Sequence, residues 1–315
     1  MSDDDKTPAR EVIADYARAN YQYFRTPDGT PYALRRGSSI ARPLRSQGST
    51  GSHRQELVLG LMDDGFGVFN GTAMKEALDA LEAETLRGEA VPVYIRVAPC
   101  RENPGVSWLD LGRSDGLSVR IAPGEWELRK PSPSEVVWRR TQLTGELPVP
   151  AEGQQDRGLA KLLELCNFHP ETEPLVIAWL VGCLDPDHPV PAAFLTGPQG
   201  AGKSTAGRML SRVVEGMDSD LRRAPKDEES LIVSVAAGWV TALDNLSHIN
   251  ADMSDMMCCI VTGAESIKRA LYSDGDVVRQ RYRRPLLITG IDVGVVRPDL
   301  GERLVQLRMD RPQVR

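Results

Sequence analysis

The sequence contains few cysteines, no signal peptide and no long hydrophobic run, and each absence excludes a class of protein. Its five cysteines form no C-x-x-C pair and have no histidine at ligand spacing, so we expect reduced thiols and no zinc site. No stretch approaches the roughly 18 apolar residues of a membrane span, so no membrane partner is predicted. The N-terminus reads Met-Ser-Asp-Asp-Asp-Lys, which is acidic where a signal peptide is basic and then apolar. These features predict a cytoplasmic protein.

Positive charge is also scarce. The chain has 38 Lys and Arg against 44 Asp and Glu, a formal net charge of −6. The surface as a whole therefore lacks the basic excess of a nucleic-acid-binding protein, and any such site must be a local basic patch. The length of 315 residues allows two domains or one large one, and 41% hydrophobic residues are enough for a core.

The sequence does contain a complete phosphate-binding loop at residues 197–204, which reads Gly-Pro-Gln-Gly-Ala-Gly-Lys-Ser. Gly197 and Gly202 let the backbone turn so that N–H groups point at phosphate oxygens. Lys203 would reach the β- and γ-phosphates, and the Ser204 hydroxyl would bind Mg²⁺. We therefore expect ATP and Mg²⁺ as cofactors. The expected nucleotide-binding residues are Gly197, Pro198, Gln199, Gly200, Ala201, Gly202, Lys203, Ser204 and Thr205.

The surroundings of this loop have the required order of strand, loop and helix. Residues 192–196 are a short apolar run typical of a buried parallel strand, and residues 204–214 carry apolar side chains at helical spacing. The alternative is a glycine-rich surface turn that happens to carry a lysine. We expect an α/β fold, a P-loop NTPase of the AAA+ type whose parallel sheet has helices on both faces.

A proline- and glycine-bearing stretch at residues 145–153 reads as a linker. It predicts an N-terminal module over residues 1–150 and an ATPase domain over residues 151–315. Within the module, residues 21–24 and 32–34 predict a hairpin, residues 72–86 predict a helix, and later alternating runs predict a small antiparallel sheet. The module is therefore expected to be α+β, and we find no chemical constellation in it.

Two further strands end in polar side chains. The apolar run before Asp244 predicts a strand whose terminal carboxylate holds Mg²⁺ together with Ser204. The run at residues 285–290 predicts a strand that ends near Thr289, whose hydroxyl could reach the γ-phosphate or position the attacking water. The alternative for Thr289 is a simple strand cap.

Residues 299–303, Asp-Leu-Gly-Glu-Arg, predict the end of a helix and lead into a final strand at 304–307. In a ring-shaped ATPase, Arg303 would face the γ-phosphate of a neighbouring subunit, where an arginine supplied in trans stabilises the transition state. The alternative is a structural role in which Arg303 pairs with Asp299 or Glu302. Arg297 is the second choice for the catalytic arginine.

Residues 156–310 resemble the helicase domain of superfamily 3 and poxvirus-type primase-helicases of phages, plasmids and bacterial mobile elements. The shared features are the phosphate loop, Leu-Asp-Asn at 243–245, Val-Thr-Gly-Ala-Glu at 261–265, a basic hairpin, a strand ending in threonine, and Asp-Leu-x-x-Arg at 299–303. The resemblance implies an AAA+ ring, often a hexamer, that uses ATP to move on single-stranded or forked DNA during replication. It implies an accessory or origin-binding role for residues 1–150.

The sequence departs from this pattern in three places. Asn245 stands where many relatives have a carboxylate, and an amide can orient a water but cannot accept its proton. The predicted hairpin arms, 267–272 and 277–282, join at an acidic turn where relatives carry a basic tip. The candidate DNA contacts therefore lie along its arms and base; they are Lys268, Arg269, Arg279 and Arg281, with Arg283 and Arg284 beside them. A solvated, salt-bridged hairpin is the alternative. No helical lid is expected after the last strand.

The leading hypothesis is an ATPase that drives a motor on DNA, a replicative helicase or helicase-like protein with Lys203, Asp244, Asn245, Thr289 and Arg303 as catalytic residues. Its rival is a nucleotide-dependent assembly or regulatory ATPase with little hydrolysis, which Asn245 and the acidic turn favour. A small-molecule kinase would need a lid and an acceptor pocket, and the sequence shows neither.

Overall fold

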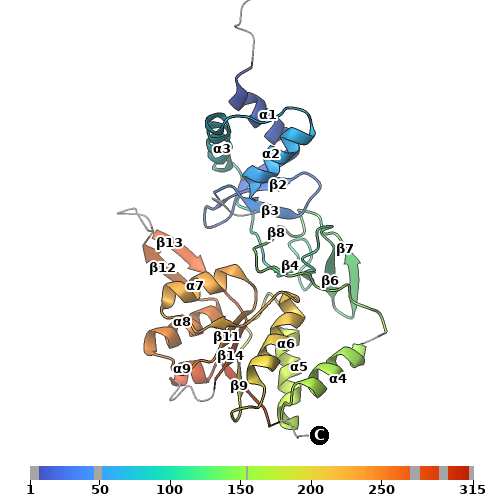
Figure 1. Ribbon diagram of the computed structural model, residues 1–315, viewed down its shortest axis with the longest axis vertical. Coiled ribbons are helices and arrows are strands. Elements are labelled where there is room, and N and C mark those ends of the chain that lie inside the picture. The colour runs from blue at the N-terminus through green and yellow to red at the C-terminus, as the bar shows by residue number, and fades with distance from the viewer. Residues whose placement is uncertain (1–6, 46–51, 154, 270–276, 291–296, 312–315) are drawn as a thin grey trace, which may run out of the picture. The chain divides into compact units, whose positions relative to one another are not determined.

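The computed structural model describes residues 7–45, 52–153, 155–269, 277–290 and 297–311 (Figure 1). Their contacts divide the chain into two compact units. Unit 1 is formed by the residues up to Tyr94 together with Lys130–Arg140. Unit 2 is formed by Ile95–Arg129 and by the chain from Thr141 onward.

Unit 1 is a small α+β module. Its helices are α1 (Ala9–Asn20), α2 (His53–Asp63) and α3 (Gly71–Thr85). Its sheet has the order β1-β2-β3-β8, formed by β1 (Tyr21–Arg25), β2 (Pro31–Arg35), β3 (Ile40–Pro43) and β8 (Trp138–Arg139). The predicted hairpin is confirmed, because β1 and β2 pair antiparallel with Tyr21 opposite Arg35. The helices bury Ile13, Leu57 and Leu81 in a common core.

The predicted helix at residues 72–86 is confirmed as α3. The Asn70 side chain accepts a hydrogen bond of 2.8 Å from the Ala73 N–H and so satisfies one of the free donors in the first turn. Met74, Ala77 and Leu81 then lie on its buried face at the spacing of a helix.

Unit 2 contains a four-stranded sheet and a five-stranded sheet. The first is antiparallel, in the order β4-β5-β6-β7, with strands β4 (Val97–Pro99), β5 (Ser107–Asp110), β6 (Ser118–Ala122) and β7 (Glu125–Arg129). The second is parallel, in the order β10-β11-β14-β9-β15, with strands β9 (Ala192–Thr196), β10 (Arg222–Arg223), β11 (Thr241–Asp244), β14 (Leu286–Thr289) and β15 (Leu304–Arg308).

Helices cover both faces of the parallel sheet. The helices are α4 (Gln155–Leu165), α5 (Glu173–Gly182), α6 (Lys203–Glu215), α7 (Glu228–Ala237), α8 (Ala251–Thr262) and α9 (Pro298–Gly301). Trp179 of α5 and Leu210 of α6 pack with Leu195 in one core. Leu231 of α7 and Met257 of α8 pack with the neighbouring strand residue Phe194 in another. Successive side chains of a strand point to opposite faces, so the two helix layers lie on opposite sides of the sheet (Figure 1).

The division between the units differs from the one expected near residue 150. Residues 95–129 and 141–150 group with the parallel sheet, although the linker signal at 145–153 placed them in the N-terminal module. Arg96 is buried between these segments and α6 and bonds to both, and no local sequence pattern predicts its burial.

Arg96 is completely buried and has a positive φ of 60°. Its guanidinium donates to the carbonyl oxygens of Asp110 at 2.6 Å, Gly145 at 2.6 Å and Glu215 at 2.5 Å. Its Nε lies 3.5 Å from Oε2 of Glu215, a carboxylate that is 2% exposed. The antiparallel sheet, the 141–150 segment and the end of α6 are thus joined around one buried ion pair.

Glycines allow the backbones to approach each other around Arg96. A Cβ on Gly145 would lie 2.9 Å from the Glu215 carbonyl oxygen, and one on Gly112 would lie 2.3 Å from the Gly145 carbonyl oxygen. Gly145 is therefore required for close packing against the end of α6, and it does not mark a linker.

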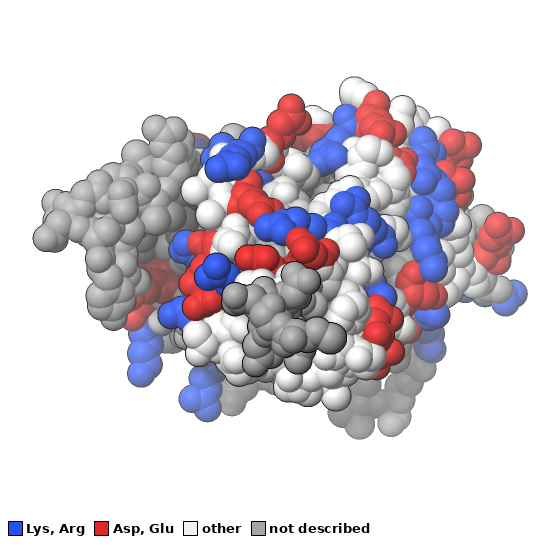
Figure 2. Space-filling view, turned by 90° about the horizontal axis from the view of Figure 1, so that it is seen from above, with Lys and Arg blue, Asp and Glu red and all other residues white. Residues whose placement is uncertain are grey.

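Acidic and basic side chains are interspersed over most of the face shown in Figure 2. Among the residues described, the structure contains no helix that is both long and apolar enough to span a membrane.

We predict that Arg96→Ala lowers the free energy of unfolding of unit 2 by about 3–5 kcal/mol, because it leaves the Glu215 carboxylate buried without its counter-charge. Urea unfolding would measure the loss. Arg113→Ala is the matched control, because its pairs with Asp115 and Glu146 are open to solvent and should contribute little to stability. Equal effects of the two substitutions would contradict a structural role for the buried pair.

Candidate functional site

The candidate site is built on the turn between β9 and α6. β9 is buried and leads into residues 197–202, and Lys203 begins the helix. Gly200 and Gly202 have φ values of 82° and 83°, in the left-handed region that favours glycine. Gly197 has a φ of 150°, and a Cβ there would lie 2.5 Å from the Met309 carbonyl oxygen. The glycine spacing therefore follows from both the backbone conformation and close packing.

Lys203 folds back over the loop. Its Nζ donates to the carbonyl oxygen of Gly197 at 2.8 Å and to that of Pro198 at 3.0 Å. The first turn of α6 begins at Lys203, and the N–H groups of a first helical turn have no partners within the helix. A helix N-terminus and a lysine together favour a bound anion such as phosphate.

Asp244 connects the loop with the neighbouring strands. Its Oδ1 accepts a hydrogen bond of 2.8 Å from the Ser204 hydroxyl and one of 2.5 Å from the Thr289 hydroxyl. Asp244 ends β11 and Thr289 ends β14, and the two strands are parallel neighbours in the sheet. Three side chains far apart in the sequence therefore meet at one carboxylate oxygen.

Asn245 follows Asp244 in a left-handed conformation with a φ of 54°. Its N–H donates to the Thr289 hydroxyl oxygen at 3.0 Å. Asparagine tolerates this conformation better than most residues other than glycine. Thr289 is 2% exposed. Its hydroxyl group bonds both the Asp244 carboxylate and the main chain of Asn245.

A cleft of about 380 Å³ opens at these groups. It is lined by Gln199, Gly200, Gly202, Lys203, Ser204, Thr205, Asp244, Asn245, Thr289 and Gly290. The cleft lies at the carboxyl ends of the strands, where β9 and β14 are adjacent and their following helices, α6 and α9, leave to opposite faces. Open parallel sheets bind ligands at such a switch point.

The donor groups in the cleft suit a magnesium ion. Mg²⁺ in proteins is bound by one or two carboxylates plus substrate phosphates and waters, and the Ser204 hydroxyl and Asp244 carboxylate supply such oxygens. In the part of the chain that the structure describes, no group of three or more His, Cys, Asp or Glu side chains is placed to hold a metal ion.

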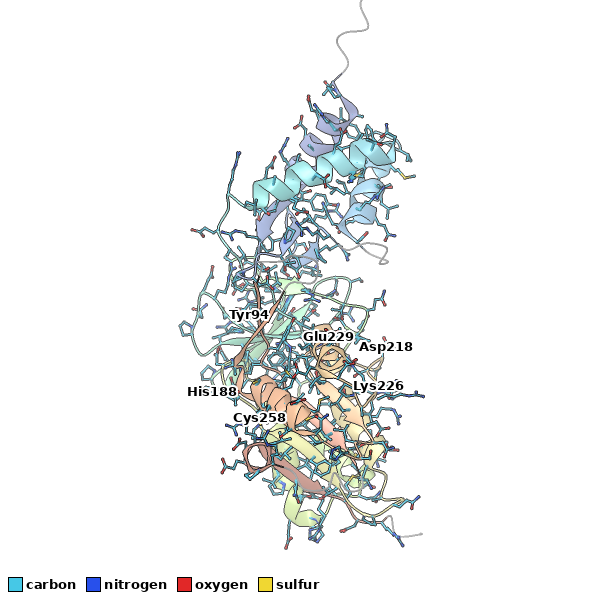
Figure 3. All side chains as sticks on the ribbon, turned by 90° about the vertical axis from the view of Figure 1, so that its left-hand side faces the viewer. Tyr94, His188, Asp218, Lys226, Glu229 and Cys258 are labelled. Atoms are coloured by element: carbon cyan, nitrogen blue, oxygen red, sulfur yellow. The ribbon has the colours of Figure 1, made fainter. Side chains whose placement is uncertain are left out.

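Arg303 lies at the amino ends of the parallel strands, opposite to the end that carries the phosphate loop. Its carbonyl oxygen accepts from the Ala192 N–H at 2.8 Å, so it stands beside the amino end of β9, roughly 13 Å from the phosphate loop at the other end of that strand. Its Nη1 donates to the Asp299 carbonyl oxygen. Burial raises the pKa of Cys258 on α8 (Figure 3), and the positive charge of Arg303 acts against this rise. The structure does not bring Arg303 to the cleft of its own chain.

Arg297, the second choice for the catalytic arginine, is also separate from the cleft. Its Nη1 pairs with Asp255 of α8 at 2.8 Å and 3.0 Å to the two carboxylate oxygens. Both arginines therefore belong to the surface formed by α8 and α9.

The predicted basic hairpin is present in the backbone. It is formed by β12 (Glu265–Arg269) and β13 (Val277–Arg281), which pair antiparallel with Lys268 opposite Val278 and Ile267 opposite Arg279. The acidic turn at 273–276 lies outside the described residues.

The two arginines at the hairpin base have structural contacts. Arg283 donates to the Pro186 carbonyl oxygen, and the Arg284 guanidinium lies 5.1 Å from the centre of the Trp239 ring. Both arginines therefore make contacts within unit 2 at the base of the hairpin.

Sequence reasoning missed Glu215, the last residue of α6. Its Oε1 accepts from the N–H groups of Trp239 and Val240, both at 2.5 Å, just before β11. A glutamate near the end of an amphipathic helix normally faces solvent, so no pattern distinguished this one.

Two family models match the chain. Residues 159–315 match the model described as the actinomycete integrative conjugative element replication protein. Residues 10–87 match the model described as the AICE Reps-like N-terminal domain. No curated protein matches the sequence.

Several solved structures are similar in part. The apo structure of the NrS-1 C-terminal region (305–718) shares 11% identity with a TM-score of 0.47, over 98% of this chain and 63% of that one. The A form apo structure of the same region shares 14% identity with a TM-score of 0.44, over 96% of this chain and 61% of that one. The chain thus spans less than two thirds of the length of these structures.

Proposed function

We propose that this chain, in which residues 159–315 and 10–87 match the two family models of mobile-element replication proteins, is an ATPase that acts as a motor on DNA during replication. We propose for unit 2 a P-loop NTPase fold of the AAA+ type, in line with the resemblance to superfamily 3 and poxvirus-type helicases. The observation that carries the proposal is the meeting of Ser204, Asp244 and Thr289 beside the glycine loop.

In the proposed reaction, the loop amides and the first turn of α6 hold the ATP phosphates. Lys203 exchanges its contacts with the loop carbonyls for contacts with phosphate oxygens. Ser204 and Asp244 hold Mg²⁺, which when bound neutralises charge on the β- and γ-phosphates. Thr289 keeps the Asp244 carboxylate turned toward Ser204 and fixes the main chain at Asn245.

Asn245 motivates a second candidate function. Its amide can orient the attacking water but cannot take a proton from it, which favours slow hydrolysis. A nucleotide-dependent assembly ATPase, which changes its oligomeric state with ATP and does not move on DNA, would tolerate this residue. The response of the ATPase rate to single-stranded DNA separates the two functions.

We place the catalytic arginine in a neighbouring copy of the chain. Because Arg303 stands at the amino ends of the parallel strands, it serves a cleft only if that cleft belongs to another subunit. This arrangement requires self-association, and we propose a ring. The DNA would contact the arms of the hairpin through Lys268, Arg269, Arg279 and Arg281, whose backbone belongs to β12 and β13.

We predict that Lys203→Ala weakens the binding of ATP with Mg²⁺ by roughly 100-fold or more, because about two charge-assisted hydrogen bonds to phosphate are lost. Asp244→Asn should keep ATP binding in the absence of Mg²⁺ but lose the gain in affinity that Mg²⁺ provides and eliminate hydrolysis, because Mg²⁺ loses its anchoring charge. Calorimetry and phosphate release measure these effects. Lys226→Ala, on the loop between β10 and α7, is the control and should behave as wild type (Figure 3). Unchanged affinity of the Lys203 variant would remove the nucleotide site.

We predict that Arg303→Ala binds ATP normally but is inactive alone, because the arginine acts in trans. Mixing it with Lys203→Ala protein should restore part of the activity, at interfaces where an intact loop meets an intact arginine. Steady-state ATPase measurements across mixing ratios test this. The proposal fails if the protein stays monomeric with ATP at high concentration in light scattering.

We predict that each alanine substitution at Lys268, Arg269, Arg279 or Arg281 lowers the slope of log affinity against log salt for single-stranded DNA by about 0.7–1. Each arm residue is expected to contact one phosphate. A fluorescence titration over a salt series measures the slope. Lys161→Ala on α4, a lysine paired with Glu164, should leave the slope unchanged. Arm variants indistinguishable from wild type would favour the assembly ATPase.

A further inference from the structure

Glu215 joins the two elements that carry the expected metal ligands. It ends α6, the helix in which Ser204 is the second residue, and it accepts hydrogen bonds from Trp239 and Val240, just before β11. β11 ends at Asp244. The helix and the strand are therefore connected at one end by Glu215 and at the other by the bond of 2.8 Å between Ser204 and Asp244.

The geometry makes the distant end of α6 relevant to the site. The helix is about 18 Å long, so a rotation or slide at Glu215 moves Ser204 relative to Asp244. Mg²⁺ tolerates little displacement, because it requires near-octahedral geometry with ligands at about 2.0–2.1 Å. The register between α6 and β11 therefore affects whether the two oxygens can bind one ion.

A carboxylate can accept two N–H groups with one oxygen, but its burial is very unfavourable without a positive charge nearby. Arg96 supplies that charge with Nε at 3.5 Å from Oε2 and also donates to the Glu215 carbonyl oxygen at the end of the helix. A cation is favoured at a helix C-terminus. Arg96 comes from the turn into β4, so the antiparallel sheet takes part in fixing the end of α6.

We propose that Glu215 is a positioning residue for the nucleotide site. It sets the register of α6 against β11, so that Ser204 and Asp244 bind Mg²⁺ together. This inference rests on the proposed function. Arg96 makes the buried carboxylate possible, and the hydrogen bonds to Trp239 and Val240 transmit its position to β11.

The test separates the hydrogen bonds from the charge. In an Arg96→Met background, Glu215→Gln keeps an acceptor for the two N–H groups, and Glu215→Met has a similar length without an acceptor. Both double variants remove the buried charges and the same three hydrogen bonds of Arg96 to carbonyl oxygens, so they differ only at residue 215. Any difference between them reports the contacts of Glu215 with the start of β11.

The readout is the gain in ATP affinity that Mg²⁺ provides, measured by calorimetry with and without the metal. The Arg96→Met, Glu215→Gln protein should keep this gain within about 3-fold of wild type. The Arg96→Met, Glu215→Met protein should lose about 10-fold or more of it, the range seen when residues that orient metal ligands are changed. Its affinity for ATP without Mg²⁺ should stay unchanged. Equal gains in the two proteins would overturn the proposal.

Two controls exclude a general loss of stability. Ser211→Ala removes a buried hydroxyl of α6 that bonds Ser219 at 2.8 Å, and it should lower stability without changing the Mg²⁺ gain. If the Glu215→Met variant does not fold, Glu215→Leu in the same background takes its place. A Mg²⁺ gain in the Ser211 variant as small as that of the Met variant would contradict a specific role for Glu215.

A second readout does not depend on nucleotide. Hydrogen exchange of the β11 amides should be at least about 10-fold faster in the Glu215→Met protein than in the Glu215→Gln protein, because β11 has lost its connection to the C-terminal end of α6. If the wild type fails to bind ATP with Mg²⁺, the proposed function falls, and the exchange rates then test only whether Glu215 sets the register of α6 against β11. Equal exchange rates in the two proteins would reject that role.

Discussion

The buried ion pair of Arg96 and Glu215 is the constraint around which unit 2 is arranged. An isolated buried charge is very unfavourable, so the pair requires close geometry and hydrogen bonds to the remaining donors and acceptors. The guanidinium meets this need with three carbonyl oxygens, and the carboxylate with two N–H groups. Because these groups come from the antiparallel sheet, the 141–150 segment, α6 and the start of β11, the pair joins segments distant in the sequence. Gly145 allows the backbones to come close enough for it.

The candidate site lies at the other ends of the same elements. α6 begins at the phosphate loop and β11 ends at Asp244, so the site and the ion pair are at opposite ends of one helix and one strand. Thr289 adds β14 to the arrangement through its bonds with Asp244 and Asn245. The groups expected to bind phosphate and metal thus come from one chain, whereas Arg303 stands at the amino ends of the parallel strands. This separation is the physical reason to expect that catalysis involves more than one copy.

Much of the local structure could be predicted from the sequence, because it depends on short patterns. The glycine spacing at 197–202 predicts the turn whose φ values the structure shows, and the polar side chains after apolar runs predict the strand ends at Asp244 and Thr289. The helix at 72–86 and the hairpin of β1 and β2 follow from periodicity and turn residues. The division of the chain could not be predicted, because the linker-like composition at 145–153 describes the local chain, while Gly145 is needed for contact with the end of α6.

The sequence by itself determined the phosphate loop and the elements with clear patterns, such as α3 and the hairpin of β1 and β2, because turns, strand ends and helix periodicity are properties of neighbouring residues. Only the tertiary structure decided which side chains meet. It brought Ser204, Asp244 and Thr289 to one oxygen, removed Arg303 from the cleft of its own chain, and gave Arg283 and Arg284 contacts within unit 2 at the base of the hairpin. It also turned Arg96 and Glu215 inward, where charge alone predicts solvent exposure. Burial depends on partners far along the chain, and these partners cannot be predicted from one segment of the sequence.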